Sequence, residues 1–320
     1  MLTSQRITWV DWAKVICIWL MVCCHAGQKG MILNLTYQFH MPAFFIVSGM
    51  LFHPKGVGQT LKLFLVPILF YSCMNGMFRI VSTAINSSDM GGAFYSWLYS
   101  STIGLVAPDK YSPFQGYWFI FTLLFLRLTF ECSYIRKHKM LFALACLLFS
   151  IIEPALVLPS TIQLWKPYHL MSCMPFFVIG MLLRDYKFDI TRGSFEFKLL
   201  LAVIFIILTF IQGRVDLGEY NFGVNYILLY INAIIGSYLL FNICNILPYR
   251  NWIKTLSIGT FCILGLHGIL YGPILGAFRH IMYFGNMYLP LLVGAMVLAI
   301  CYPIIVLLNK HCPLLLGKAS

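Results

Sequence analysis

The sequence predicts an all-α membrane protein, a polytopic bundle of about ten transmembrane helices. The chain is 60% hydrophobic and only 10% charged, and its mean hydropathy is +0.84, whereas soluble domains have about 25% charged residues. Apolar runs of near 20 residues recur along the whole chain, and each is long enough to cross about 30 Å of hydrocarbon. No polar stretch is long enough to bury a core of its own. We therefore expect one integral membrane domain over residues 1–320.

The expected spans follow one another, and the connectors between them hold the turn residues and most of the charges. The first span contains Asp11 and Lys14, which argue against a cleaved signal peptide. The longest connector, residues 87–115, is rich in Gly, Ser and Tyr and too polar to span. The approximate ranges of the spans are 8–27, 37–53, 63–86, 116–135, 140–158, 168–186, 197–213, 225–247, 256–275 and 287–308.

The basic residues are distributed unequally between the two sides of this arrangement. With the N-terminus placed in the cytoplasm, 15 of the 22 Lys and Arg residues fall in inner segments and 6 in outer ones. Basic residues accumulate on the cytoplasmic side, so both termini are expected there. The net charge of +12 is then mainly a topology signal, and no nucleic-acid partner is expected. Most of the 11 cysteines lie in apolar spans without metal-ligand spacing, which predicts no metal site.

One stripe of the first span carries two groups suited to chemistry. Lys14 and His25 are eleven residues apart, which places them on one helix face with an axial separation of about 16 Å. Asp11 precedes Lys14 by one turn, where it would orient or partly neutralise the ammonium. Charged groups within a span usually face a protein-lined cavity. The alternatives are a Lys14 that reaches to the membrane interface and a His25 with a structural role only.

Further histidines are expected near His25 in the outer half of the membrane. His40 lies near the outer end of the second span, His169 begins the sixth span on the outer side, and His267 lies in the outer half of the ninth. If they converge, they form a polar chamber there. Enrichment of polar residues at the interface is the alternative, above all for His40 and His169.

Five segments resemble the acyltransferase 3 family of integral membrane acyltransferases. The first, RITWVDWAKVICIWLMVCCH, has the family's basic residue followed by His after ten residues, and the second, FHMPAFFIVSGMLF, resembles its second-span motif. The segments YWFIFTLL, MPFFVIGMLLRDY and LSIGTFCILGLH resemble later signatures in the usual order. The resemblance covers nearly the whole chain, in the form without an appended extracellular hydrolase-like domain.

The resemblance implies transfer of an acyl group, usually acetyl, from cytoplasmic acyl-CoA to a carbohydrate hydroxyl. Lys14 then matches the residue that meets the coenzyme A phosphates, and His25 matches the essential histidine. We expect His25, with Asp11, to be catalytic, and Lys14, Lys62 and Arg127 to bind the donor. His40, His267 and Trp118 are candidates for acceptor binding.

One departure concerns the cytoplasmic end of the third span. Many family members carry an Arg-rich element there, whereas this chain has GQTLKLFLVP with Lys62 alone. On the fourth span, Arg127 and Glu131 have the i,i+4 spacing of an ion pair. They would either pair with each other or extend the phosphate site.

The physical chemistry agrees with this reading. A hydroxyl is a poor nucleophile, and an imidazole, which titrates near neutral pH, is a suitable general base. A long uncharged pantetheine arm would connect a cationic inner mouth with His25. The runner-up is a secondary transporter of a small anionic or sugar-like solute, and a third hypothesis is an enzyme acting on a lipid-linked sugar. We expect a multi-pass protein of a bacterial cytoplasmic membrane, with acyl-CoA, a carbohydrate acceptor and membrane lipid as partners.

Overall fold

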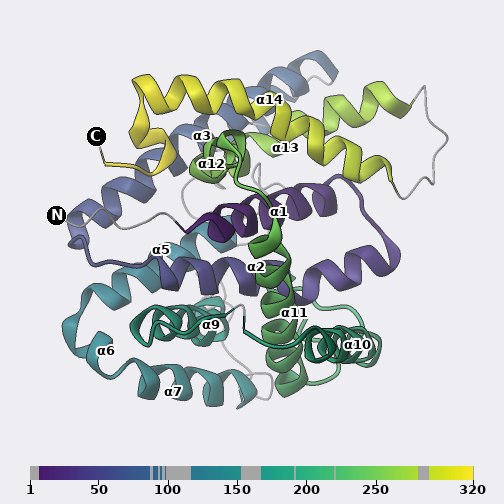
Figure 1. Ribbon diagram of the computed structural model, residues 1–320. Helices are drawn as coiled ribbons and strands as arrows, with labels where there is room; N and C mark the ends of the chain where they lie inside the picture. Colours follow the sequence, from purple (N-terminus) through teal and green to yellow (C-terminus); the bar gives the residue numbers. More distant parts are fainter. Residues whose placement is uncertain are drawn as a thin grey trace.

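The computed structural model shows a bundle of helices (Figure 1). It describes residues 7–86, 117–152, 167–190, 192–219, 221–279 and 288–319, with a few positions between 89 and 98. Within this part of the chain no strand forms beyond an isolated bridge between Asp216 and Asn221. The main helices are α1 (Thr8–His25), α2 (Gly30–Met50), α3 (Val57–Asn86), α5 (Tyr117–Glu131), α6 (Ser133–Lys137), α7 (Lys139–Ile152), α9 (Pro167–Asp185), α10 (Phe195–Gln212), α11 (Tyr226–Ile246), α12 (Asn251–Ile258), α13 (Thr260–Arg279) and α14 (Leu289–His311), with short 3-10 turns η3 (Leu217–Glu219) and η4 (Pro313–Leu316).

The all-α membrane fold is confirmed, and each of the ten expected spans coincides with a helix in the part of the chain that is described. Among the described residues, six helices are long and apolar enough to cross a membrane: α1, α3, α10, α11, α13 and α14. The helices α5 and α7 are shorter. The helices α2 and α9 are long enough but carry more polar residues, which agrees with their position inside the bundle rather than against lipid. Most of the connector 87–115 and residues 153–158 of the fifth span lie outside the described residues.

The ninth span begins later than the sequence indicates. The helix is interrupted at Gly259, between α12 and α13. An added Cβ at Gly259 would lie 2.2 Å from the side chain of Ile305 on α14. A side chain at this position would push α14 away. The short α12 is therefore a separate element, and it packs against both α1 and α14.

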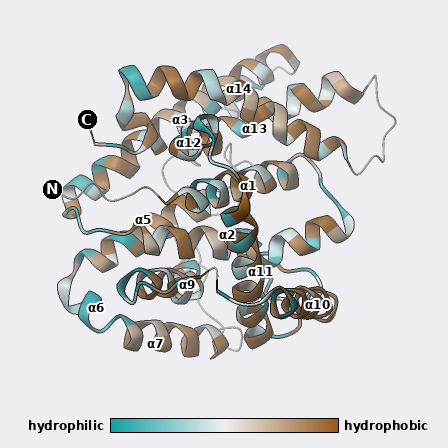
Figure 2. Cartoon of the chain, viewed as in Figure 1, coloured by the Kyte–Doolittle hydropathy of each residue, from teal (hydrophilic) through white to brown (hydrophobic). Residues whose placement is uncertain are grey.

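The outer helices carry an apolar surface. Along α10 only Phe205, Thr209 and Gln212 are buried, whereas large apolar side chains such as Phe210 and Ile207 are exposed. Figure 2 shows α7 and α10 as hydrophobic over most of their length. Such a surface is stable only in contact with lipid hydrocarbon or another protein, which agrees with a membrane-spanning bundle.

The centre of the bundle is the crossing of α2 and α9, where two backbones meet. A Cβ on Gly49 would lie 1.9 Å from the carbonyl oxygen of Phe177, and a Cβ on Gly180 would lie 1.9 Å from that of Ile46. Within a membrane, helices associate through close packing of small residues. The two glycines thus fix the spacing of α2, which contains His40, and α9, which begins near His169.

We expect Gly180→Ala to destabilise the protein strongly, because the new methyl group would overlap a main-chain oxygen that no rotamer change can move. The loss should appear as a lower yield of folded protein and a lower midpoint of thermal unfolding in detergent. Gly58→Ala is the matched control, since nothing lies within 4 Å of its Cβ. Equal thermal stability of the two variants would contradict this packing.

Candidate functional site

A basic cavity lies at the end of the bundle where α1 begins and α14 ends. It has a volume of about 280 Å³. Four cations line it, and none of the described lining residues is acidic. These cations come from four different segments: Lys14 on α1, Lys55 in the turn after α2, Arg127 on α5, and Lys318 beyond η4. The rest of the wall is mostly apolar, with Ile18, Phe44, Phe64, Phe119 and Leu264 among its members.

Lys62, which the sequence suggested as a third donor-binding cation, is not among the lining residues. It is exposed on the first turns of α3. Lys55 and Lys318 line the cavity in its place. Lys55 lies in the turn between α2 and α3, and Lys318 follows the 3-10 turn η4, so helical periodicity gives no signal for either.

Lys14 is held by the C-terminal end of α12. Its Nζ donates a hydrogen bond to the carbonyl oxygen of Ser257 at 2.5 Å, a favourable position for a cation because helix carbonyls carry partial negative charge. The Ser257 hydroxyl donates to Oδ1 of the buried Asp11 at 2.6 Å. Asp11, Ser257 and Lys14 therefore form one buried polar unit that fixes the ammonium at the wall of the cavity.

Asp11 lies far from His25. The two residues are at opposite ends of α1, fourteen positions apart, which corresponds to about 21 Å along an unbroken helix. The structure thus brings Asp11 together with Lys14. Its contacts suit a residue that positions the ammonium.

Arg127 and Glu131 do not interact in the way that their spacing suggests. The Glu131 carboxylate accepts hydrogen bonds from the backbone N–H groups of Lys55 and Gly56, at 3.0 and 2.9 Å, and from the Thr60 hydroxyl at 2.9 Å. It thereby satisfies donors at the N-terminus of α3. The Arg127 guanidinium lies over the rings of Phe52 and Phe64, and its buried Nε has no hydrogen-bond partner among the described residues. A buried unsatisfied donor is costly, so Arg127 is well suited to an anion in the cavity.

At the far end of α1, His25 lies beside His267 of α13. Their ring centroids are 5.2 Å apart. The Nδ1 atom of His267 lies 2.7 Å from the carbonyl oxygen of Leu264. Because a carbonyl only accepts, Nδ1 carries the proton, and a neutral His267 then has its acceptor at Nε2. Leu264 lines the basic cavity, so one helical turn separates the cavity wall from the histidine pair.

His40 belongs to the same neighbourhood. Its ring lies 5.2 Å from that of Tyr37, and its Nδ1 is 2.8 Å from the carbonyl oxygen of Thr36. A charge on His25 would act on both His40 and His267. His25 and His267 are thus in ring contact, and His40 is near enough to His25 to be affected by its charge; that these residues form an outer polar chamber stays a prediction.

Trp118 and His169 form a separate pair. Their rings are stacked at 4.8 Å, and the indole edge of Trp118 lies against Gly218 of the loop between α10 and α11. One face of Trp118 is thus covered by an imidazole, and its Nε1 edge is covered by Gly218.

Sequence reasoning missed Asp216 in the loop between α10 and α11. This carboxylate is buried, accepts hydrogen bonds from the N–H groups of Gly218 and Glu219, and interacts electrostatically with Cys24 and Tyr37 near His25. Burial raises the pKa of Asp216 to about 6, and the charge of Glu219 adds to the rise. A loop carboxylate has no periodicity to mark it, so only the fold shows that it caps the histidine end.

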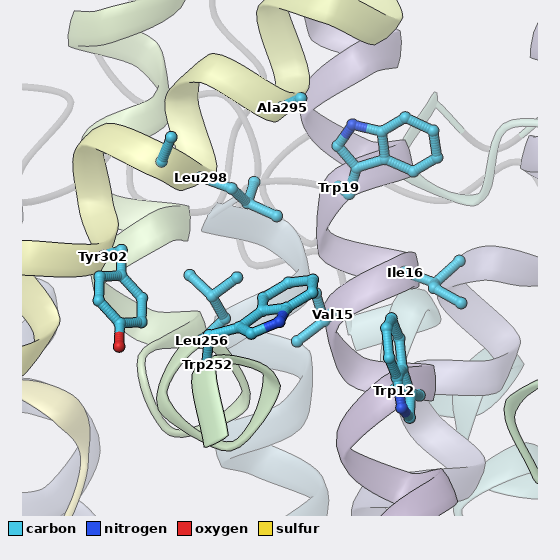
Figure 3. A pocket seen from close by; sticks show the side chains of 10 residues that line it. Trp12, Val15, Ile16, Trp19, Trp252, Leu256, Ala295, Leu298 and Tyr302 are labelled. Atoms are coloured by element: carbon cyan, nitrogen blue, oxygen red, sulfur yellow. The ribbon is translucent and has the colours of Figure 1, made fainter. Parts of the chain in front are cut away.

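A larger hollow lies on the opposite face of α1. It has a volume of about 580 Å³, and side chains from α1, α12 and α14 face it, including Trp12, Trp19, Trp252 and Tyr302 (Figure 3). Among the described residues, no charged group lines it. An anionic substrate would gain no favourable contact there, so the smaller basic cavity is the better candidate site.

The fold and its two polar ends define an integral membrane protein that contains a cationic cavity and a histidine cluster within one helix bundle. A family model described as "Acyltransferase domain", the acyltransferase 3 model, matches residues 7–308. The chain therefore belongs to the acyltransferase 3 family and is a membrane acyltransferase. No curated protein and no solved structure matched it.

Proposed function

We propose that this protein transfers an acyl group, in the first instance acetyl, from acyl-CoA to a carbohydrate hydroxyl. The observation that carries the proposal is the basic cavity. Lys14 and Ile18 of α1 line this cavity, and the same helix ends at His25. Four cations without a lining carboxylate favour a ligand with several negative charges. The nucleotide end of coenzyme A is such a ligand.

The donor would lie along the Lys14–His25 face of α1. Its phosphates would contact Lys14 and Arg127, and its uncharged pantetheine arm would follow the apolar wall past Ile18 towards His25 and His267. The axial distance of about 16 Å between Lys14 and His25 is comparable with the length of such an arm. The thioester carbonyl would then be close to the histidine pair.

His25 would act as the general base. Its neutral imidazole accepts the proton of the acceptor hydroxyl while that oxygen attacks the thioester carbonyl, and the thiol of coenzyme A leaves. His40, His267 and Trp118 would contact the acceptor. The carbohydrate is either a cell-surface polysaccharide or a lipid-linked sugar, and either would reach His25 from the outer end of the bundle.

We also propose that both termini face the cytoplasm of a bacterial inner membrane. Of the 22 Lys and Arg residues, 15 fall in segments on the same side as the termini, and basic residues accumulate on the cytoplasmic side. The donor is made in the cytoplasm, so the basic cavity should open there.

One experiment tests the donor and the orientation together. The protein is reconstituted in vesicles with a labelled acetyl-CoA and candidate glycans, and ester-bound label is measured. In a variant in which the exposed Cys73 and Cys132 are replaced by Ser, the exposed Cys312 after α14 reports by thiol labelling which side the C-terminus occupies. We expect ester formation only when acetyl-CoA is supplied on the side where Cys312 is labelled. Uptake of solute without ester formation would favour a transporter instead.

A further inference from the structure

The segment after α14 folds back into the bundle. It turns through η4 and packs against α3, α13 and α14 (Figure 1). Leu316 is buried at 4% exposure, and the Tyr71 hydroxyl donates a hydrogen bond to the carbonyl oxygen of Leu315 at 3.2 Å. These contacts hold the segment as a wall of the molecule.

Gly317 allows the segment after α14 to pack in this position. Its φ of +69° lies in the left-handed region, and an added Cβ would lie 2.9 Å from the ring of Phe261 and 3.5 Å from the carbonyl oxygen of Leu63. Only glycine adopts this conformation without strain and also passes this close to Phe261. The chain thereby enters the cavity wall between α3 and α13, and the next residue is Lys318.

Lys318 adds a cation to the basic cavity. It lines the cavity together with Lys14, Lys55 and Arg127, and its Nζ donates to the neutral Oδ1 of Asn309 at 2.7 Å. The Asn309 amide is neutral, so this hydrogen bond orients the ammonium without bringing a carboxylate to it. Four cations on the wall of one cavity give it a positive potential, which favours an anionic ligand there.

We propose that the segment Pro313–Lys318 is a wall of the donor site and that Lys318 binds a phosphate group at the nucleotide end of the donor. This inference rests on the proposed function, because it takes the donor to be acyl-CoA. Lys318 is then a specificity residue: it distinguishes a donor with phosphates in the cavity from a thioester that lacks them.

The test measures binding of coenzyme A, 3′-dephospho-coenzyme A and pantetheine to the full-length protein in detergent by titration calorimetry. Lys318→Ala should weaken coenzyme A binding by about tenfold, the size expected for loss of a charge-assisted hydrogen bond, and leave pantetheine binding unchanged. Lys318→Arg should restore most of the affinity. Lys310→Ala is the matched control, because this exposed lysine of α14 does not line the cavity.

Gly317→Ala tests the seat of the segment without changing any charge. It should weaken coenzyme A binding while the lysine side chain is intact. Thermal unfolding measured in parallel shows whether each variant is folded. A phosphate-bearing lipid headgroup as the true ligand would be revealed if wild-type protein bound phosphatidylglycerol vesicles in a Lys318-dependent way but bound coenzyme A independently of Lys318, and this result would overturn the proposal.

The remaining outcomes distinguish failure of the proposed function from failure of the role assigned to Lys318. If wild-type protein binds no coenzyme A, the proposed function fails and the role of Lys318 fails with it. If wild-type protein binds coenzyme A and the folded Lys318→Ala variant binds it equally well, the proposed function stands and the inference about the C-terminal segment is wrong.

Discussion

His25→Ala should abolish detectable acyl transfer while the protein folds and binds the donor. A missing general base typically costs about 10²–10⁴-fold in rate. His25→Gln should be equally inactive, because an amide keeps a hydrogen bond but cannot accept the proton. The measurement is ester-bound label from acetyl-CoA, normalised to folded protein. The activity of the wild type should rise with pH as the imidazole becomes neutral.

His53→Ala is the matched control for this substitution. His53 is exposed in the turn after α2, at the opposite end of the bundle from His25, so its loss should leave turnover unchanged. A purely structural His25 would behave differently from the expected catalytic residue, since folded yield, donor binding and activity would fall together. Wild-type turnover in folded His25→Ala protein would remove His25 from the mechanism.

Lys14→Ala should weaken coenzyme A binding about 10–100-fold. A hydrogen bond to a charged group contributes about 1.5–3 kcal/mol, and 1.4 kcal/mol corresponds to a factor of ten. Lys14→Arg should retain much of the affinity, because the charge remains near the same carbonyl of α12. The dissociation constant is measured by titration calorimetry on protein in detergent.

Lys62→Ala provides the control for Lys14. Both are lysines on the same expected side of the membrane, but Lys62 is exposed and outside the cavity, so its replacement should change the affinity little. If Lys62→Ala weakened binding as much as Lys14→Ala, the effect would come from the general positive potential of the surface, and the basic cavity would lose its special role.

The sequence predicts the spans well because each apolar run is read locally. Its placement of α1 residues is equally local: a continuous helix puts Lys14 and His25 on one face whatever surrounds them. What the sequence could not predict depends on contacts between distant segments. The sequence suggests that His267 approaches His25, but the contact itself requires α13 to pack beside α1. The interruption at Gly259, where α12 ends and α13 begins, was not predicted.

The expectation for Arg127 shows the same limit. Spacing on α5 offers Glu131 as its partner, and no rule of periodicity signals that the turn after α2 presents two backbone N–H groups to that carboxylate. Lys55 and Lys318 were missed for a related reason, because they lie outside the long helices, in segments whose position is fixed only by the folded bundle.

The hydrogen bonds from the turn after α2 to the Glu131 carboxylate restrict which residues this turn can contain. The hydrogen bonds that Glu131 accepts at positions 55 and 56 come from backbone N–H groups and do not involve the Lys55 side chain. Proline is excluded at both positions because it lacks the N–H, and Gly56, with a φ of +89°, is restricted further. Because Glu131 contacts only the main chain at position 55, replacement of the Lys55 side chain by any residue other than proline leaves this N–H available to the carboxylate. Selection can therefore tune the charge of the cavity wall one residue at a time, on a scaffold that does not depend on that residue.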